Sequence, residues 1–171
     1  MGARACILDA SLVFSLGKAG RLDVLARTPG FRWHIAPVTR AELKSPETRV
    51  PVEQLILASV ITPVELDSAD QAGIELLAEW SELVGPGEAE AIAIGISRGW
   101  LIGLEDLQAR RRLDQRVARG HWINCANVLL DAVQGGAMTL AEADGIFQAL
   151  DVFSSYTKRG VTSLADLQER K

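Results

Sequence analysis

The sequence predicts a three-layer α/β domain, with helices on both faces of a mainly parallel sheet of about five strands and extra helices at the C-terminus. Short apolar runs of strand length alternate with segments of helical periodicity along the chain. The run Trp-Leu-Ile-Gly-Leu at residues 100–104 is too short for a helix and apolar throughout. Such runs are typical of strands that helices bury on both faces.

The composition indicates a globular protein with no general affinity for nucleic acid. The chain has 171 residues, which is enough for one domain, and its 48% hydrophobic and 23% charged residues exclude a disordered chain. The formal net charge of -4 offers no overall attraction to nucleic acid. Any such contact must be local, or depend on cations bound in an acidic pocket.

The two cysteines, Cys6 and Cys125, have no CxxC or Cys-His spacing, so neither a zinc site nor a disulfide is expected. The first residues lack a signal sequence, and no later stretch has transmembrane length. We therefore expect a cytoplasmic protein with reduced core cysteines and no membrane partner.

The first strand is expected at residues 5–8, an apolar run that ends at Asp9. Residues 10–19 follow with apolar side chains at helical spacing, and Gly20 is a natural end for that helix. Taken alone, Asp9 is best interpreted as a helix N-cap, whose carboxylate satisfies free backbone N–H groups. A second helical piece is expected at residues 22–26.

The second strand is expected at residues 33–36, with His34 as an ordinary strand residue and not a ligand. Residues 38–43 begin a helix that carries Glu42, and Pro46 interrupts it. Without outside support, Glu42 is best interpreted as a solvated helix residue.

The next segment contains an edge strand. Residues 52–58 have a helical pattern, and residues 60–66 form a third strand that Pro63 keeps near an edge of the sheet. The following helix is expected to run to Val84, with Asp67 or Ser68 as its N-cap.

The stretch from Pro86 to Arg112 places carboxylates at two element ends. A Pro-Gly turn leads into a helix that starts with Glu88 and ends at Gly99, and the strand at 100–104 stops at Glu105 and Asp106. Ligands collect at the carboxyl ends of strands in open parallel sheets. If carboxylates from elsewhere in the chain lie beside Glu88, Glu105 and Asp106, together they form a site for a hard cation.

The rest of the chain is mostly helical. Residues 107–117 predict an amphipathic helix whose arginines face outward or toward the site, namely Arg110, Arg111, Arg112 and Arg116. A solvated helix face is an equally good interpretation of each arginine. The remaining expected elements are a strand at 122–124, a helix at 126–133, and two helices opened by capping-box patterns at Thr139 and Ser163.

Four segments of the chain resemble the motifs of the PIN domain family, and in particular its short VapC-type toxins. They are ILDAS with Asp9 and Ser11, IAPVTRAEL with Glu42, PGEAEAIA with Glu88, and LIGLEDLQARR with Asp106 and Arg110. Each motif alone is weak, but four in the right order and at sensible spacing are specific. Asn124 to Asn127 depart from the family pattern after the last strand, where Gly-Thr or an acidic or polar residue is common.

The resemblance implies a catalytic and metal-binding set of carboxylates: Asp9, Glu42, Glu88 and Asp106. Glu90 is a possible substitute for Glu88, and Glu105 is a further candidate ligand. Residues two apart on a helix point about 160 to 200° away from each other, so Glu88 and Glu90 are not both expected in one site. The implied substrate contacts are Ser11, Arg110, Arg111 and Arg112.

These carboxylates suit Mg²⁺ or Mn²⁺, which prefer oxygen ligands. Such ions lower the pKa of an attacking water and neutralise charge that develops during phosphodiester hydrolysis. Without metal the carboxylates repel one another, which should raise the pKa of at least one of them.

The function implied by the resemblance is that of a metal-dependent endoribonuclease, the toxin of a type II toxin-antitoxin pair. Its implied partners are an RNA substrate, an antitoxin protein and a second copy of the chain. Residues 1–135 would form the PIN-like nuclease domain, and residues 136–171 a helical extension of the same domain. The alternative is a catalytically inactive PIN-fold module that binds RNA or protein.

Overall fold

The computed structural model describes residues 2–117 and 120–168, which form an α/β fold around one five-stranded parallel sheet. The strands are β1 (Arg4–Leu8), β2 (Phe31–Ile35), β3 (Ile61–Pro63), β4 (Leu101–Gly103) and β5 (Trp122–Ile123). They lie in the order β3-β2-β1-β4-β5, and every pair of neighbours is parallel. The predicted fold class is confirmed.

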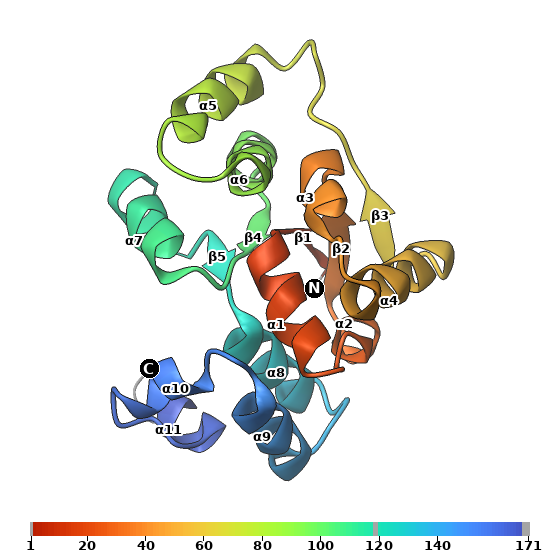
Figure 1. Cartoon of the computed structure of the whole chain (residues 1–171), viewed down its shortest axis with the longest axis vertical. Coiled ribbons are helices and arrows are strands. Elements are labelled where there is room, and N and C mark those ends of the chain that lie inside the picture. The colour runs from red at the N-terminus through yellow and green to blue at the C-terminus, as the bar shows by residue number, and fades with distance from the viewer. Residues whose placement is uncertain (1, 118–119, 169–171) are drawn as a thin grey trace.

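Helices cover both faces of this sheet (Figure 1). They are α1 (Ala10–Lys18), α2 (Asp23–Arg27), α3 (Pro37–Glu42), α4 (Pro46–Leu57), α5 (Gln71–Ser81), α6 (Pro86–Arg98), α7 (Leu107–Arg116), α8 (Cys125–Gln134), α9 (Leu140–Ala149), α10 (Phe153–Thr157) and α11 (Leu164–Gln168). In Figure 1, α5 and α6 lie on one side of the strands, and α8 to α11 lie on the other.

Successive strand residues point to opposite faces of the sheet, and each face contributes to an apolar core. Leu8 and Trp33 pack into a core with residues of α1, α4 and α8. Ile7 and Ile102 pack into a second core with residues of α6 and α7. Because both sides are buried around the central strands, β1 and β4 carry continuous apolar runs, whereas β2 alternates between apolar and polar residues.

The register of β1 and β4 brings two acidic segments to one edge. Leu8 pairs with Gly103, and the Asp9 backbone N–H continues the ladder with a 2.9 Å hydrogen bond to the Gly103 carbonyl. The direction in which successive strands are added reverses between β1 and β4. Strands β2 and β3 lie on one side of β1, whereas β4 and β5 lie on its other side. Such switch points are where open parallel sheets bind ligands.

Three elements have boundaries that differ by three residues or more from those predicted. Helix α3 ends before Pro46, as predicted, but α4 starts at Pro46 and not at residue 52, because proline is well suited to the first position of a helix. Helix α5 runs from Gln71 to Ser81, and its N-cap is Asp70, whose carboxylate accepts a 2.9 Å hydrogen bond from Gly73 N. Strand β3 is shorter than predicted, although it does lie at the edge of the sheet, as Pro63 indicated.

The C-terminal helices share the core of the first layer. Phe147, Tyr156 and Leu164 belong to the same apolar cluster as residues of α1 and α8. The predicted capping pattern at Ser163 is present, since Ser163 Oγ accepts from Asp166 N and Asp166 Oδ2 accepts from Ser163 N. The short helix α10 was not predicted.

Both cysteines are buried free thiols, as expected, and burial raises the pKa of each. Within residues 2–117 and 120–168, every helix is too short or too polar to cross a lipid bilayer.

Candidate active site

Asp9 follows β1 and caps helix α1, and one of its two carboxylate oxygens has no hydrogen-bond partner among the described residues. Oδ2 accepts hydrogen bonds from Ser11 N at 2.8 Å and from Ser11 Oγ at 2.5 Å. Oδ1 is buried and has no hydrogen-bond partner among the described residues. The side chain is only 1% exposed, and burial raises its pKa, against the lowering effect of the Ser11 hydrogen bonds. A buried, unpaired carboxylate oxygen is costly unless something else binds it.

Ser11 joins the ends of the two neighbouring strands. Its hydroxyl donates to Asp9 Oδ2 and accepts a 2.9 Å hydrogen bond from the backbone N–H of Glu105, which follows β4. The sequence suggested Ser11 as a substrate contact, whereas the structure uses its hydroxyl inside the protein, where it fixes the Asp9 carboxylate.

Glu42 reaches the site from the end of α3. Its Oε1 accepts a 3.1 Å hydrogen bond from Gly87 N in the first turn of α6. A Cβ atom added at Gly87 would lie 2.6 Å from this oxygen, so the approach requires a glycine. The N-terminal end of α6 favours the negative charge.

The pKa of Glu88 responds to the charges of the other three carboxylates. Burial raises its pKa to about 7, and the charges of Asp9, Asp106 and Glu42 add to this increase, while a hydrogen bond from Gly85 N opposes it. The structure therefore brings these four carboxylates, from four separate segments, to one region. The acidic cluster is defined as Asp9, Glu42, Glu88 and Asp106.

Glu90 lies on a different side of α6. Its Oε2 accepts a 2.9 Å hydrogen bond from Val38 N at the start of α3. Burial raises its pKa first, and the carboxylates that contribute are Glu65 and Glu42. This placement favours Glu88 over Glu90 as the member of the cluster, in agreement with their spacing on the helix.

The two acidic residues after β4 have different surroundings. Asp106 is the N-cap of α7, where its Oδ1 accepts from Ala109 N at 2.7 Å. Glu105 is 5% exposed, and its Oε2 accepts a 2.9 Å hydrogen bond from Cys125 N at the start of α8. Glu105 thus ties β4 to α8.

The three candidate arginines on α7 also have different environments. Arg110 is buried, donates to the Glu105 carbonyl at 3.1 Å and lies over the Trp122 ring at 4.9 Å. Arg112 donates to the Leu83 carbonyl and is half-buried. Arg111 is exposed. Of the three, Arg111 is therefore the one placed to meet a solvent-borne anion.

The loop after β5 is used for capping. Asn124 is the N-cap of α8 and exchanges hydrogen bonds with Asn127. Its side-chain amide also donates a 2.8 Å hydrogen bond to the Tyr156 hydroxyl on α10. This loop therefore ties α10 to the end of β5.

In the described part of the chain, no three histidine, cysteine, aspartate or glutamate side chains meet in an arrangement that could hold a metal ion. Like charges repel, and each member of the acidic cluster is tied to a backbone N–H at a helix end. The donor set nevertheless fits a hard cation, because it offers only carboxylate oxygens and includes the unpaired, buried Oδ1 of Asp9. In each member the cap bond uses one carboxylate oxygen, so the other oxygen could bind a cation while the cap persists.

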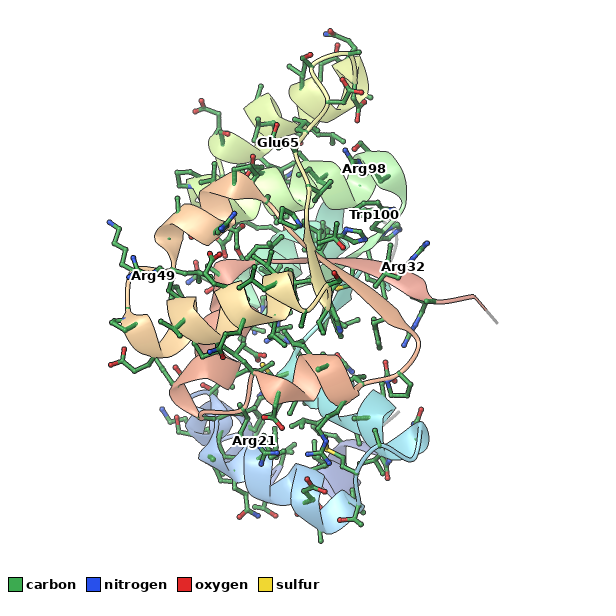
Figure 2. All side chains as sticks on the ribbon, turned by 90° about the vertical axis from the view of Figure 1, so that its right-hand side faces the viewer. Arg21, Arg32, Arg49, Glu65, Arg98 and Trp100 are labelled. Atoms are coloured by element: carbon green, nitrogen blue, oxygen red, sulfur yellow. The ribbon has the colours of Figure 1, made fainter. Side chains whose placement is uncertain are left out.

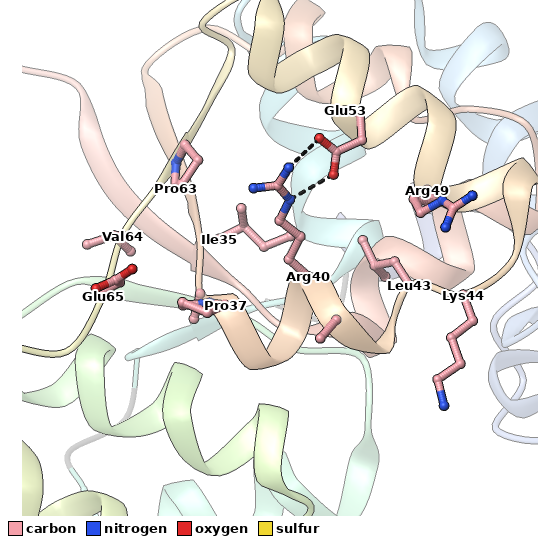
Figure 3. Close-up of a pocket in the computed structure, with 12 residues that line it drawn as sticks. Ile35, Pro37, Arg40, Leu43, Lys44, Arg49, Glu53, Pro63, Val64 and Glu65 are labelled. Carbon is pink, nitrogen blue, oxygen red and sulfur yellow. Dashed lines mark hydrogen bonds and ion pairs between the residues drawn. The ribbon is translucent and has the colours of Figure 1, made fainter.

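Two hollows adjoin this end of the sheet. One, of about 410 Å³, lies between α1, α7 and α10, and Ser11 and Asp106 are part of its wall. The other, of about 930 Å³, lies beside α3 and has walls that include Ile35 and Val64 (Figure 3). Arg40 and Glu53 form a double hydrogen bond across it, at 2.7 and 2.5 Å.

A basic and aromatic patch lies at the opposite end of the strands. His34 stacks on Trp100 with ring centroids 4.2 Å apart, and Arg98 lies over the same indole at 4.9 Å. Figure 2 shows Arg32, Arg98 and Trp100 on the side where β1 begins, and Arg49 on the other side. This patch is therefore not part of the acidic cluster.

Sequence reasoning missed the residues that α10 and the loop before it bring to the smaller hollow. They are Asp151, Val152, Ser155, Tyr156 and Arg159. Nothing in their local pattern marks them, since their position depends on the docking of α10 against α1 and α8.

No model of a known protein family matches the chain, and a search of curated proteins finds no match.

Proposed function

We propose that this protein is a metal-dependent endoribonuclease of the PIN type, which hydrolyses RNA phosphodiester bonds as the toxin of a type II toxin-antitoxin pair. One observation carries the proposal: burial raises the pKa of Glu88 to about 7, and Asp9, Asp106 and Glu42 lie close enough for their charges to add to this rise. A cluster of like charges at the switch point of a parallel sheet is costly for folding, and this cost is a common mark of a functional site.

In this proposal the acidic cluster holds Mg²⁺ or Mn²⁺. When bound, the ion supplies an activated water and neutralises charge on the phosphate. Ser11 keeps Oδ2 of Asp9 occupied and so leaves Oδ1 as the oxygen that would hold the ion. The backbone N–H of Gly87 orients Glu42. Glu88, with a pKa of about 7 before metal binds, can release a proton near neutral pH.

Exposed cations near the cluster would position the RNA backbone. Arg111 is exposed on α7, one residue after the buried Arg110. Charged hydrogen bonds from such side chains hold phosphates without reading sequence. Arg110 acts indirectly, by fixing the turn that carries Asp106.

The larger hollow beside α3 supports the antitoxin part of the proposal. Its apolar wall includes Ile35, Leu43 and Val64, and Lys44 and Arg49 supply positive charge (Figure 3). An amphipathic antitoxin segment with acidic side chains would match this combination. A homodimer is part of the same proposal and rests on the family resemblance, whereas a cytoplasmic location rests on the sequence pattern.

The second candidate is a catalytically inactive PIN-fold module that binds RNA or protein. It is favoured by the absence, among the described residues, of three ligand side chains that already converge on one point. It predicts RNA binding that needs no divalent cation.

Cleavage of a mixed RNA pool distinguishes the two candidates. Purified protein is incubated with Mg²⁺, with Mn²⁺ and with EDTA, beside Asp9→Asn, Asp106→Asn and the matched control Glu90→Gln. We expect metal-dependent cleavage that the two aspartate substitutions abolish and Glu90→Gln retains. Folded wild-type protein that cuts nothing with either metal would favour the binding module.

A further inference from the structure

The smaller hollow, between α1, α7 and α10, adjoins the acidic cluster and has one of its members, Asp106, in its wall. Ser11 and Asp106 line it, and Ser11 Oγ lies 2.5 Å from Asp9 Oδ2. Its volume of about 410 Å³ lies within the usual range for a small-molecule pocket, which is about 300–1,000 Å³. In Figure 1, α10 lies below α7 and to the left of α1. A strand of RNA that crosses the acidic cluster would pass the mouth of this hollow.

The lining combines apolar and polar side chains. Phe14, Leu107 and Val152 supply apolar surface, and Lys18, Ser155 and Arg159 supply polar groups. A nucleobase has the same two characters, because its faces are apolar and its edges form hydrogen bonds. A phosphate alone would not use the apolar side chains.

The lining offers both donors and acceptors to the edge of a base. Both carboxylate oxygens of Asp151 are already occupied, Oδ1 by Ser15 Oγ and Oδ2 by Lys18 Nζ, each at 2.8 Å. Tyr156 accepts a hydrogen bond from Asn124, and that bond does not use its hydroxyl proton. Asp106 also lines the hollow, and its bond to Ala109 N uses Oδ1. Hydroxyl donors and carboxylate acceptors pair with the edges of bases.

The walls of this hollow are fixed before any ligand arrives. Asp151 joins α1 to the chain that precedes α10 through Ser15 and Lys18, and Arg159 lies over the Tyr156 ring at 4.8 Å and donates to the Ser155 carbonyl. Preformed walls reduce the entropy that binding would cost.

We propose that this hollow binds the base of a nucleotide next to the RNA bond that is cut. The inference depends on the proposed function only where it places the bound base next to the bond that is cut. The base pocket itself is tested without metal and without cleavage.

The test is a titration of isotope-labelled, full-length protein in EDTA with guanosine, uridine, adenosine and inorganic phosphate, followed by amide chemical shifts. We expect all three nucleosides to shift amides around Phe14, Val152 and Ser155, and phosphate to leave them unmoved. Shifts confined to the hollow beside α3, no shifts at all, or the same shifts with phosphate would overturn the proposal.

A matched pair of variants tests whether the base binds in this hollow. Ser155→Trp fills the hollow from an exposed position on its wall, whereas Ser154→Trp adds the same side chain to the preceding exposed residue, which does not line it. We expect Ser155→Trp to weaken guanosine binding by about tenfold or more, the scale on which bound bases respond to lost contacts, and Ser154→Trp to have no effect. Equal binding by both variants would contradict the assignment.

The cleavage assay then separates this inference from the proposed function. With metal, Ser155→Trp should keep its metal dependence but change which nucleotides flank the cut sites. If wild-type protein cuts no RNA, the proposed function fails, and the nucleoside titration still decides whether the base pocket exists.

Discussion

Glu42 Oε1 accepts a hydrogen bond of 3.1 Å from the backbone N–H of Gly87, and this contact orients a carboxylate of α3 at the N-terminus of α6. The position of Glu42 in the acidic cluster therefore depends on the glycine at residue 87. The first prediction tests that dependence.

Gly87→Ala should impair the site but not the fold. The new Cβ would lie 2.6 Å from Glu42 Oε1, and the end of this side chain can move away. Because alanine favours the helix by about 1 kcal/mol, we expect an unfolding temperature close to that of the wild type. Metal affinity and cleavage should fall about 10- to 100-fold, as when a supporting contact of a metal ligand is lost.

The control for this change is Gly145→Ala, in α9, where an added Cβ meets nothing within 4 Å. It should stabilise the protein slightly and leave Mn²⁺ binding unchanged. Thermal unfolding and Mn²⁺ titration of both variants measure the two effects. Equal metal affinity in both alanine variants would show that Glu42 is not a ligand.

Ser11→Ala should reduce both stability and metal affinity. It removes the hydroxyl that donates to Asp9 and accepts from Glu105 N, and so leaves a backbone N–H without its partner. We expect a loss of about 1–3 kcal/mol in the free energy of unfolding, measured by urea denaturation. Ser97→Ala, which removes a single 3.3 Å hydrogen bond on α6, is the matched control and should cost less.

Glu88 should make the metal-free protein less stable as pH rises. Its pKa is about 7 in the folded protein, above the ordinary value of 4.5, so the folded state holds the proton that the unfolded state has lost. The free energy of unfolding must therefore fall as pH rises between these two values. In EDTA, Glu88→Gln should flatten this decline.

Burial also raises the pKa of Asp9, Glu90 and Glu105, and it lowers the pKa of His34. The difference between wild type and Glu88→Gln is therefore the informative quantity, measured by urea denaturation at pH about 5 and about 8. A difference that does not change with pH would contradict the raised pKa.

Arg110 and Arg111 should have separate effects. Arg110→Met removes a buried cation that lies 3.9 Å from Glu105 Oε1 and donates to the Glu105 carbonyl, so we expect a loss of about 3 kcal/mol in stability. Arg111→Met changes an exposed side chain and should leave unfolding unaltered. RNA affinity should fall in Arg111→Met, with reduced salt dependence. The opposite pattern would place Arg110 on the RNA.

Local sequence patterns were sufficient for the sheet and for most helices. The apolar runs that end at Asp9 and at Glu105 lie beside each other as β1 and β4, as expected for buried parallel strands. The start of α5 was predicted wrongly, because several capping residues occur close together and Asp70 has the favourable contact, with Gly73 N.

The roles of Ser11 and Arg110 depend on tertiary contacts that no local pattern contains. The hydroxyl of Ser11 meets the backbone of Glu105, which is far away in the sequence, and Arg110 turns inward over Trp122. For the same reason, the hollow beside Asp106 could not be predicted, since α10 completes it from the C-terminal extension.

Binding of Mn²⁺, followed by electron paramagnetic resonance, tests most directly whether the acidic cluster is a metal site. Wild-type protein, Asp9→Asn, Glu88→Gln and the control Glu90→Gln are titrated under the same conditions. We predict that wild type and Glu90→Gln bind Mn²⁺ at the cluster, and that Asp9→Asn and Glu88→Gln lose this binding. Equal binding by Asp9→Asn and wild type, or no binding by the folded wild-type protein, would contradict the account.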